Sequence, residues 1–150
     1  DTDYKIDHDN FSSSPNRNQS NGLLQMTRYV DQYNLYYSGI RVDGTAVIKK
    51  KKNGVYTTLA QKQIFPGTYS IAGNTNLLPH NAWISLRTET VTNSDGSVSI
   101  RLYVKKPGET SFTKVLEAKD TSNPILNAGY IGLRTDFMDV EFDNFKATKI

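Results

Sequence analysis

The chain has 150 residues, of which 37% are hydrophobic and 22% are charged, with nine Tyr and six Phe. This apolar and aromatic content excludes an intrinsically disordered chain, and no run approaches the roughly 18 apolar residues of a membrane-spanning helix. The absence of Cys excludes disulfides and thiolate metal sites, and a net charge of +3 is too small for a typical nucleic-acid binder.

The N-terminal sequence DTDYKIDHDN is polar and begins at Asp1 rather than Met. We therefore interpret 1–150 as a single domain of a larger polypeptide that carries other domains. Because many bacterial secreted proteins lack Cys, we expect a secreted or cell-surface location in a bacterium.

Short runs rich in Val, Ile, Tyr, Thr and Phe recur between turn signals, and helical periodicity is nearly absent. The predicted strands are 4–11, 23–29, 35–42, 46–51, 57–63, 83–91, 97–104, 113–118, 130–134 and 139–146. This number of short antiparallel strands is typical of an all-β, two-sheet antiparallel β-sandwich.

Four dipeptides of the kind that forms two-residue hairpin turns separate many of these runs. They are Asn21-Gly22, Asp43-Gly44, Asn53-Gly54 and Asp95-Gly96. Two polar stretches without a strand pattern, 11–21 and 66–81, are predicted to be long surface loops, where binding residues often lie.

The C-terminal segment 129–150 contains a Gly-x-x-Gly-Leu-Arg motif followed by Phe-Asp-Asn-Phe. The residues of the two motifs are Gly129, Gly132, Leu133, Arg134, Phe142, Asp143, Asn144 and Phe145. This segment resembles the closing strands of concanavalin A-like jelly-roll domains, the superfamily of laminin-G-like domains and carbohydrate-binding modules.

Two upstream segments are similar to the same superfamily, so the resemblance covers 23–150. The first is an Arg-aromatic pair followed by an acidic residue and an Asn/Tyr cluster. Its residues are Arg28, Tyr29, Asp31, Tyr33, Asn34, Tyr36 and Tyr37. The second is a Lys-rich strand, an Asn-Gly turn and a Thr-Leu-Ala strand within 47–60. The resemblance implies a jelly roll and, as one function among many on this fold, glycan recognition.

The opening strand of such domains has no clear match in 1–20. The last strand of a jelly roll normally pairs with the first, so we predict that 4–11 pairs with 139–146, with Tyr4 and Ile6 in the core. This pairing should bring Asp7 or Asp9 near Asp143. Families that this chain resembles often hold a structural calcium there, and we predict a calcium site at these three carboxylates.

Polar residues on alternating strands suggest a ligand-binding face. In 97–104, Arg101 and Tyr103 alternate with apolar residues, which places them on the polar side of the strand. We expect a concave sheet to bind the ligand through Tyr37, Arg41, Arg87, Arg101 and Tyr103. In the alternative interpretation, the arginines pair with acidic residues such as Glu89, Asp139 and Glu141 on neighbouring strands.

A second candidate site is a loop tip formed by Tyr29, Asp31 and Tyr33. Tyrosine suits sugar binding because its ring has a flat apolar face and a hydrogen-bonding tip. Tyr36 and Tyr37 fall on opposite faces of one strand, so they cannot both line one groove. The run Lys49–Lys52 either protects an exposed sheet edge or contacts an anionic glycan.

No nucleophile-elbow motif is present, and the glutamates Glu89, Glu109, Glu117 and Glu141 show no closely spaced acidic signature on one strand. We therefore favour a non-catalytic carbohydrate-binding module for a polysaccharide or oligosaccharide, including acidic ones. A polysaccharide lyase or glycoside hydrolase that uses the same concave face stays open as an alternative. A laminin-G-like adhesion domain with a protein partner is the third hypothesis.

Overall fold

The computed structural model describes all 150 residues and contains ten strands and no helix. The strands are β1 (Thr2–Asp9), β2 (Gly22–Asp31), β3 (Asn34–Arg41), β4 (Thr45–Lys52), β5 (Val55–Gln63), β6 (Trp83–Thr92), β7 (Val98–Lys105), β8 (Thr113–Asp120), β9 (Tyr130–Arg134) and β10 (Met138–Asp143). Every strand predicted from the sequence is present. The structure contains no helix long and apolar enough to cross a membrane.

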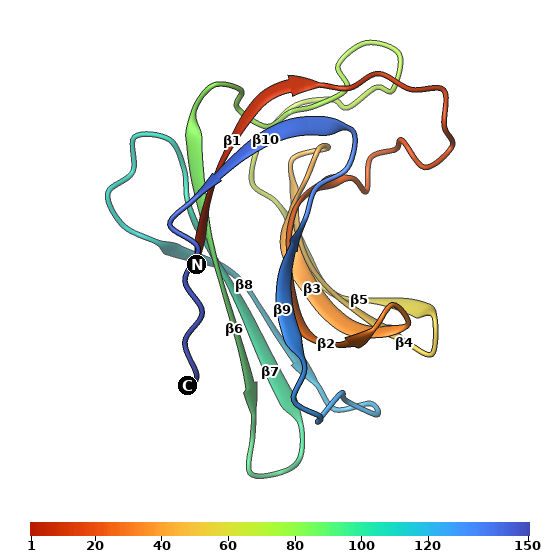
Figure 1. Cartoon of the computed structure of the whole chain (residues 1–150), viewed down its shortest axis with the longest axis vertical. Coiled ribbons are helices and arrows are strands. Elements are labelled where there is room, and N and C mark those ends of the chain that lie inside the picture. The colour runs from red at the N-terminus through yellow and green to blue at the C-terminus, as the bar shows by residue number, and fades with distance from the viewer.

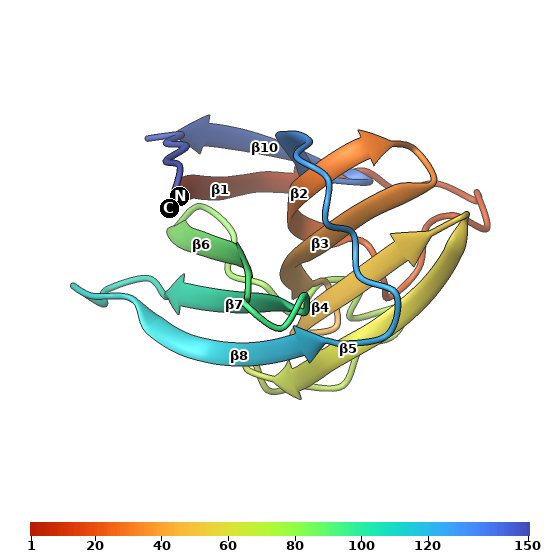
Figure 2. The same ribbon diagram turned by 90° about the horizontal axis from the view of Figure 1, so that it is seen from below.

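The strands form two antiparallel five-stranded sheets that pack as a sandwich, as Figures 1 and 2 show. Sheet A has the order β10-β1-β6-β7-β8, and sheet B has the order β5-β4-β3-β2-β9. The prediction of an all-β antiparallel sandwich is therefore confirmed, and the architecture is consistent with a jelly roll.

The core lies between the sheets and is built from alternate residues of the strands, apart from local bulges. On β7, Val98, Ile100, Leu102 and Val104 are buried in it. On β3 of the facing sheet, Tyr36 and Ile40 point into the core and are also fully buried. Because side chains on a strand point alternately to its two faces, the intervening residues of each strand lie on the outer face of their sheet.

The predicted pairing of the first and last strands is confirmed. Residues of β1 pair with β10 from Asp3↔Asp143 to Asp9↔Met138, and Tyr4 and Ile6 are completely buried. The last strand ends at Asp143 rather than at residue 146, and the next residue, Asn144, adopts a left-handed conformation with a φ of 53° that cannot continue a strand.

Three of the four predicted hairpin dipeptides lie in turns. Asn53 and Gly54 both have positive φ, as a two-residue hairpin turn requires. The prediction for Asn21-Gly22 is wrong, because a long loop precedes Gly22 at the start of β2. A Cβ at this glycine would lie 2.1 Å from the carbonyl oxygen of Ile40, so the glycine permits close approach of β3 instead.

Sheet B is curved, and its outer face, which points away from sheet A, is concave (Figure 1). The 10–21 loop borders this concavity at one end, and the β2–β3 and β4–β5 hairpin tips border it at the other. The two predicted loops, 11–21 and 66–81, are confirmed as segments outside the strands. The concave outer face of sheet B is therefore flanked by loops and turns at both ends.

Candidate functional site

The five residues predicted for one concave ligand face lie on two different sheets. Tyr37 and Arg41 are on β3 in sheet B, whereas Arg87, Arg101 and Tyr103 are on β6 and β7 in sheet A. Since the outer faces of the two sheets point in opposite directions, these side chains cannot contact one ligand together. The prediction of a single face is wrong, because alternation separates core from surface but does not tell which sheet a strand joins.

On sheet A, the candidate side chains are already paired with acidic groups. Arg87 makes two hydrogen bonds to the Asp1 carboxylate, at 2.8 and 2.9 Å. Arg101 Nε donates to Glu117 Oε1 at 2.7 Å, and the Tyr103 hydroxyl donates to Glu89 at 3.1 Å. Ion pairing of these arginines agrees with the alternative interpretation, but of the partners it named only Glu89 lies near one of them, 3.8 Å from Arg101, whereas Asp139 and Glu141 pair with His8 and Lys5.

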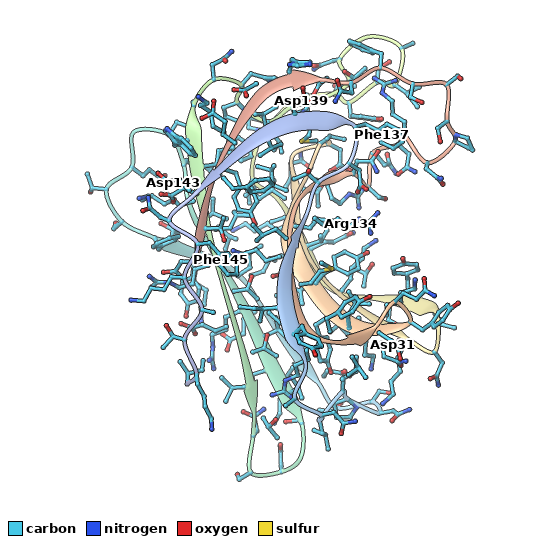
Figure 3. The ribbon with its side chains drawn as sticks, in the orientation of Figure 1. Asp31, Arg134, Phe137, Asp139, Asp143 and Phe145 are labelled. Carbon is cyan, nitrogen blue, oxygen red and sulfur yellow. The ribbon has the colours of Figure 1, made fainter.

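The outer face of sheet B carries a groove of about 210 Å³, which we call the tyrosine groove. Its lining residues are Met26, Tyr29, Gln32, Leu35, Tyr37, Lys51, Tyr56 and Arg134. The rings of Tyr37 and Tyr56 pack edge to face, with their centroids 6.2 Å apart. Figure 3 shows Arg134 projecting on this concave side of the sheet.

The Tyr29 side chain reaches the groove because β2 contains a bulge. Met26 pairs with Gly132 and Tyr29 pairs with Tyr130, so three steps along β2 match two along β9. The extra residue, Arg28, has a φ of +48°. Without this bulge, Met26 and Tyr29 would point to opposite faces of the sheet.

Arg28 itself turns toward the other sheet. Its Nη1 donates to the carbonyl oxygen of Ile125 at 2.8 Å, and its Nη2 donates to Thr92 Oγ1 at 2.7 Å. Burial lowers the pKa of this guanidinium below its usual value. The bulge thus places Tyr29 in the groove, and the hydrogen bonds of the neighbouring Arg28 side chain hold this part of β2 against the other side of the molecule.

The groove continues across β2 to the edge strand β9. A second cavity of about 250 Å³ is lined by Met26, Tyr29, Tyr130, Ile131 and Gly132, so it shares two residues with the first. Together the cavities cross sheet B from β5 to β9. Five strands spaced about 4.8 Å apart make this path roughly 19 Å long, enough for a chain of several sugar rings.

The electrostatics of the groove follow from partial burial. Burial, and then the neighbouring Tyr56 hydroxyl, raise the pKa of Tyr37 to about 12, so this phenol stays neutral and can donate a hydrogen bond. Burial opposes the charge of Arg134, but Asp136 outweighs it and raises the pKa of this guanidinium. The Arg134 Nε to Asp136 Oδ2 distance is 3.0 Å.

Of the loop-tip candidates, Tyr29 lines the groove, while Asp31 and Tyr33 form the adjacent β2–β3 turn. The Asp31 carboxylate accepts hydrogen bonds from the Tyr33 backbone N–H at 2.7 Å and from Asn34 Nδ2 at 3.0 Å. The backbone bond contributes most to lowering the pKa of Asp31. Asp31 therefore shapes the turn, whose position at the far end of sheet B is seen in Figure 3.

The sequence did not identify Tyr56, Arg134, Met26 or Leu35 as site residues. Alternation along β5 groups Tyr56 with every second residue of that strand, but it does not tell which face of the sheet they occupy. The pairing Lys51↔Tyr56 places Tyr56 on the same face as Lys51. Arg134 lies in the motif that carries the family resemblance, but nothing local indicates that β9 lies beside β2.

The predicted calcium trio does not assemble. Asp143 lies opposite Asp3, at one end of β10, and Asp9 lies opposite Met138 at the other end. Figure 3 shows the separation of Asp143 from Asp139, the neighbour of Met138. The antiparallel register therefore keeps Asp7 and Asp9 away from Asp143, and no group of three or more His, Asp or Glu side chains could hold a metal ion.

Another cavity, of about 310 Å³, opens between the sheets beside β9 and the C-terminal residues. Its lining includes Gln25, Thr27, Thr88 and the paired Arg87 and Asp1. The polar groups here are largely satisfied within the protein. For example, Thr27 Oγ1 lies 2.8 Å from Thr90 Oγ1, and Thr88 donates to Gln25 at 2.7 Å. These hydroxyl and amide groups therefore already have partners within the protein.

Neither cavity of the tyrosine groove is lined by Asp, Glu or His. Glycoside hydrolysis generally uses two carboxylates that face each other across the substrate. No protein-family model, curated protein or solved structure matches the chain.

Proposed function

We propose that this protein is a non-catalytic carbohydrate-binding module of the concanavalin A-like jelly-roll type, and that the tyrosine groove binds a polysaccharide. The observation that carries this proposal is the convergence of Tyr29, Tyr37 and Tyr56 on one groove across the concave face. Such a module would work in a secreted or cell-surface protein, joined to other domains.

The chemistry of the groove suits a sugar chain. Each tyrosine ring offers an apolar face to the C–H groups of a pyranose, and its hydroxyl can hydrogen-bond to the sugar hydroxyls. Met26 and Leu35 add apolar surface to the groove, and the Gln32 side-chain amide adds a hydrogen-bond donor and an acceptor. Apolar walls with a few polar groups are the usual composition of a ligand site.

Affinity gel electrophoresis against a panel of neutral and acidic polysaccharides tests the proposal. At least one polysaccharide should retard the wild-type protein, and Tyr37→Ala with Tyr56→Ala should abolish that retardation. Tyr103→Ala, on the other sheet, is the matched control and should leave it unchanged. Retardation by no member of the panel would contradict the proposal.

A lyase or hydrolase is distinguished by turnover. With the polysaccharides that bind, we expect no release of unsaturated or reducing ends, because the groove lining holds no carboxylate or imidazole. The raised pKa of Tyr37 also disfavours its use as a base near neutral pH. Product formation that is lost in Tyr37→Phe would instead identify an enzyme.

Exposed apolar side chains on β9 favour one second candidate, a laminin-G-like protein-binding domain. Tyr130 is 78% exposed and Ile131 is 47% exposed, and both lie on the free edge strand of sheet B. Exposed apolar patches at an edge are typical of protein contacts. If no polysaccharide retards the protein in the affinity gel, this protein-binding function is the one we would favour.

A further inference from the structure

The four consecutive lysines of β4 divide between the two faces of sheet B. Lys50 and Lys52 point toward sheet A. Lys50 Nζ lies 2.9 Å from Asp120 Oδ1, and Lys52 Nζ donates to the carbonyl oxygens of Asn123 and Pro124 at 2.9 and 3.1 Å. β4 lies between β3 and β5, so the interpretation of this run as protection of a sheet edge is wrong.

Lys49 and Lys51 occupy the other phase and lie on the concave face. Lys51 lines the tyrosine groove, with its Nζ 4.8 Å from the ring centroid of Tyr56. Lys49 pairs in register with Tyr37. Neither ammonium makes an ion pair or a hydrogen bond within the protein, in contrast to Lys50 and Lys52.

The other basic groups beside the groove are neutralised. Arg41 Nη2 lies 2.6 Å from Asp43 Oδ2, and Arg134 pairs with Asp136. The strands of sheet B carry one carboxylate, Asp31, at the end of β2. Their eight basic residues are Arg28, Arg41, Lys49, Lys50, Lys51, Lys52, Lys62 and Arg134. The positive charge on the concave face that has no carboxylate partner therefore comes from Lys51, which lines the groove, and from Lys49 on the same face of β4.

From this arrangement we infer that the tyrosine groove selects acidic polysaccharides, with Lys49 and Lys51 binding the carboxylate or sulfate groups of the chain. This inference rests on the proposed function. The two lysines are two residues apart on one strand, which places their Cα atoms about 7 Å apart along β4, across the direction of the groove. Each is next to a tyrosine, so a sugar ring stacked on Tyr37 or Tyr56 brings its acidic substituent to an ammonium.

Isothermal titration calorimetry with polygalacturonate, and with the same polymer after complete methyl esterification, tests the inference. The two polymers share a backbone and differ in charge. Alginate and chondroitin sulfate extend the acidic set, and a neutral glucan extends the neutral set. The matched variants are Lys49→Gln with Lys51→Gln, and Lys114→Gln with Lys119→Gln on β8. Both pairs remove the same charge, but the second lies on sheet A.

We expect wild-type protein to bind at least one acidic polymer about tenfold or more tightly than the neutral polymers. The Lys49/Lys51 pair should lose that preference, and the Lys114/Lys119 pair should keep it. Equal affinity for acidic and neutral polymers, or full acidic affinity in the Lys49/Lys51 variant, would overturn the inference while leaving glycan binding intact. Binding to none of the polymers would instead overturn the proposed function.

Discussion

Lys50 and Asp120 form an ion pair that joins the two sheets, with Nζ 2.9 and 2.8 Å from the two carboxylate oxygens and both side chains almost completely buried. The Tyr36 hydroxyl donates to the same carboxylate at 2.6 Å and accepts a hydrogen bond from the Ile125 backbone N–H at 2.9 Å. The Asp120 charge is therefore satisfied inside the protein by groups from both sheets.

Replacement of Lys50 should be strongly destabilising. Lys50→Met keeps the apolar stem but leaves the Asp120 carboxylate buried without its cation, which typically costs about 3–5 kcal/mol. Urea denaturation measures this difference. Lys49→Met on the same strand is the control and should change the free energy of unfolding by less than about 1 kcal/mol. Similar losses in the two variants would contradict the inward and outward assignment of the lysines.

The buried tyrosines predict loss of stability in alkali. Burial raises the pKa values of Tyr4, Tyr36 and Tyr37 above the ordinary value of about 10. In the unfolded chain these phenols ionise first, so the unfolded state binds fewer protons and the free energy of unfolding falls as pH rises above about 10. Below that pH the contribution is fully present.

Tyrosinate absorbance in native and denatured protein measures this effect. In the native protein a fraction of the nine tyrosines should titrate late or only on unfolding, whereas all should titrate together in denaturant. Identical titration curves in the two states would contradict the burial of these phenols.

Because β2 and β3 approach closely at Gly39, we expect a single added methyl group at this position to lower the stability of the protein. A Cβ at this position would lie 2.0 Å from the carbonyl oxygen of Leu23. Gly39→Ala should therefore destabilise the protein by at least about 2 kcal/mol in thermal or urea melts. Gly73→Ala is the control, because the nearest atom is 3.8 Å away, and it should change stability by less than about 1 kcal/mol.

The bulge at Arg28 predicts a difference between two substitutions that both remove the guanidinium. Arg28→Gly accommodates the positive φ, whereas Arg28→Val disfavours it because its β-branched side chain crowds the backbone. The Val variant should be less stable than the Gly variant by about 1–2 kcal/mol. It should also bind polysaccharide more weakly, because Tyr29 loses its orientation. Equal behaviour of the two variants would show that the bulge does not position Tyr29.

The strand positions could be predicted from the sequence because their signals are local. Asn53-Gly54 marks a turn, and alternation in Val98–Val104 assigns each residue to the core or the surface. The order of strands within the sheets depends on contacts between distant residues, which alternation does not encode. This is why Arg101 and Tyr37 were expected on one face but lie on opposite sheets.

The groove was predictable only in part for the same reason. The clustering of tyrosines between Tyr29 and Tyr37 indicated the correct region. The bulge that turns Tyr29 outward depends on an Arg with positive φ, and no local pattern predicts that conformation for this residue type. The register that sets Asp143 opposite Asp3, and away from Asp9, is also a long-range property.

The sole tryptophan provides an independent probe of which sheet binds the ligand. Trp83 lies on β6 in sheet A and is 42% exposed. Binding in the tyrosine groove should leave its fluorescence unchanged at saturating polysaccharide. A large change in emission that follows the binding curve would instead indicate a ligand on the outer face of sheet A.

The central claim, that the concave face of sheet B is the glycan surface, is tested most directly by mapping backbone amide chemical shifts during titration with an oligosaccharide of a retarding polysaccharide. The account predicts that the shifted amides cluster around Tyr29, Tyr37, Lys51, Tyr56 and Gly132. Shifts concentrated around Trp83, Arg101 and Tyr103, with sheet B unaffected, would contradict it.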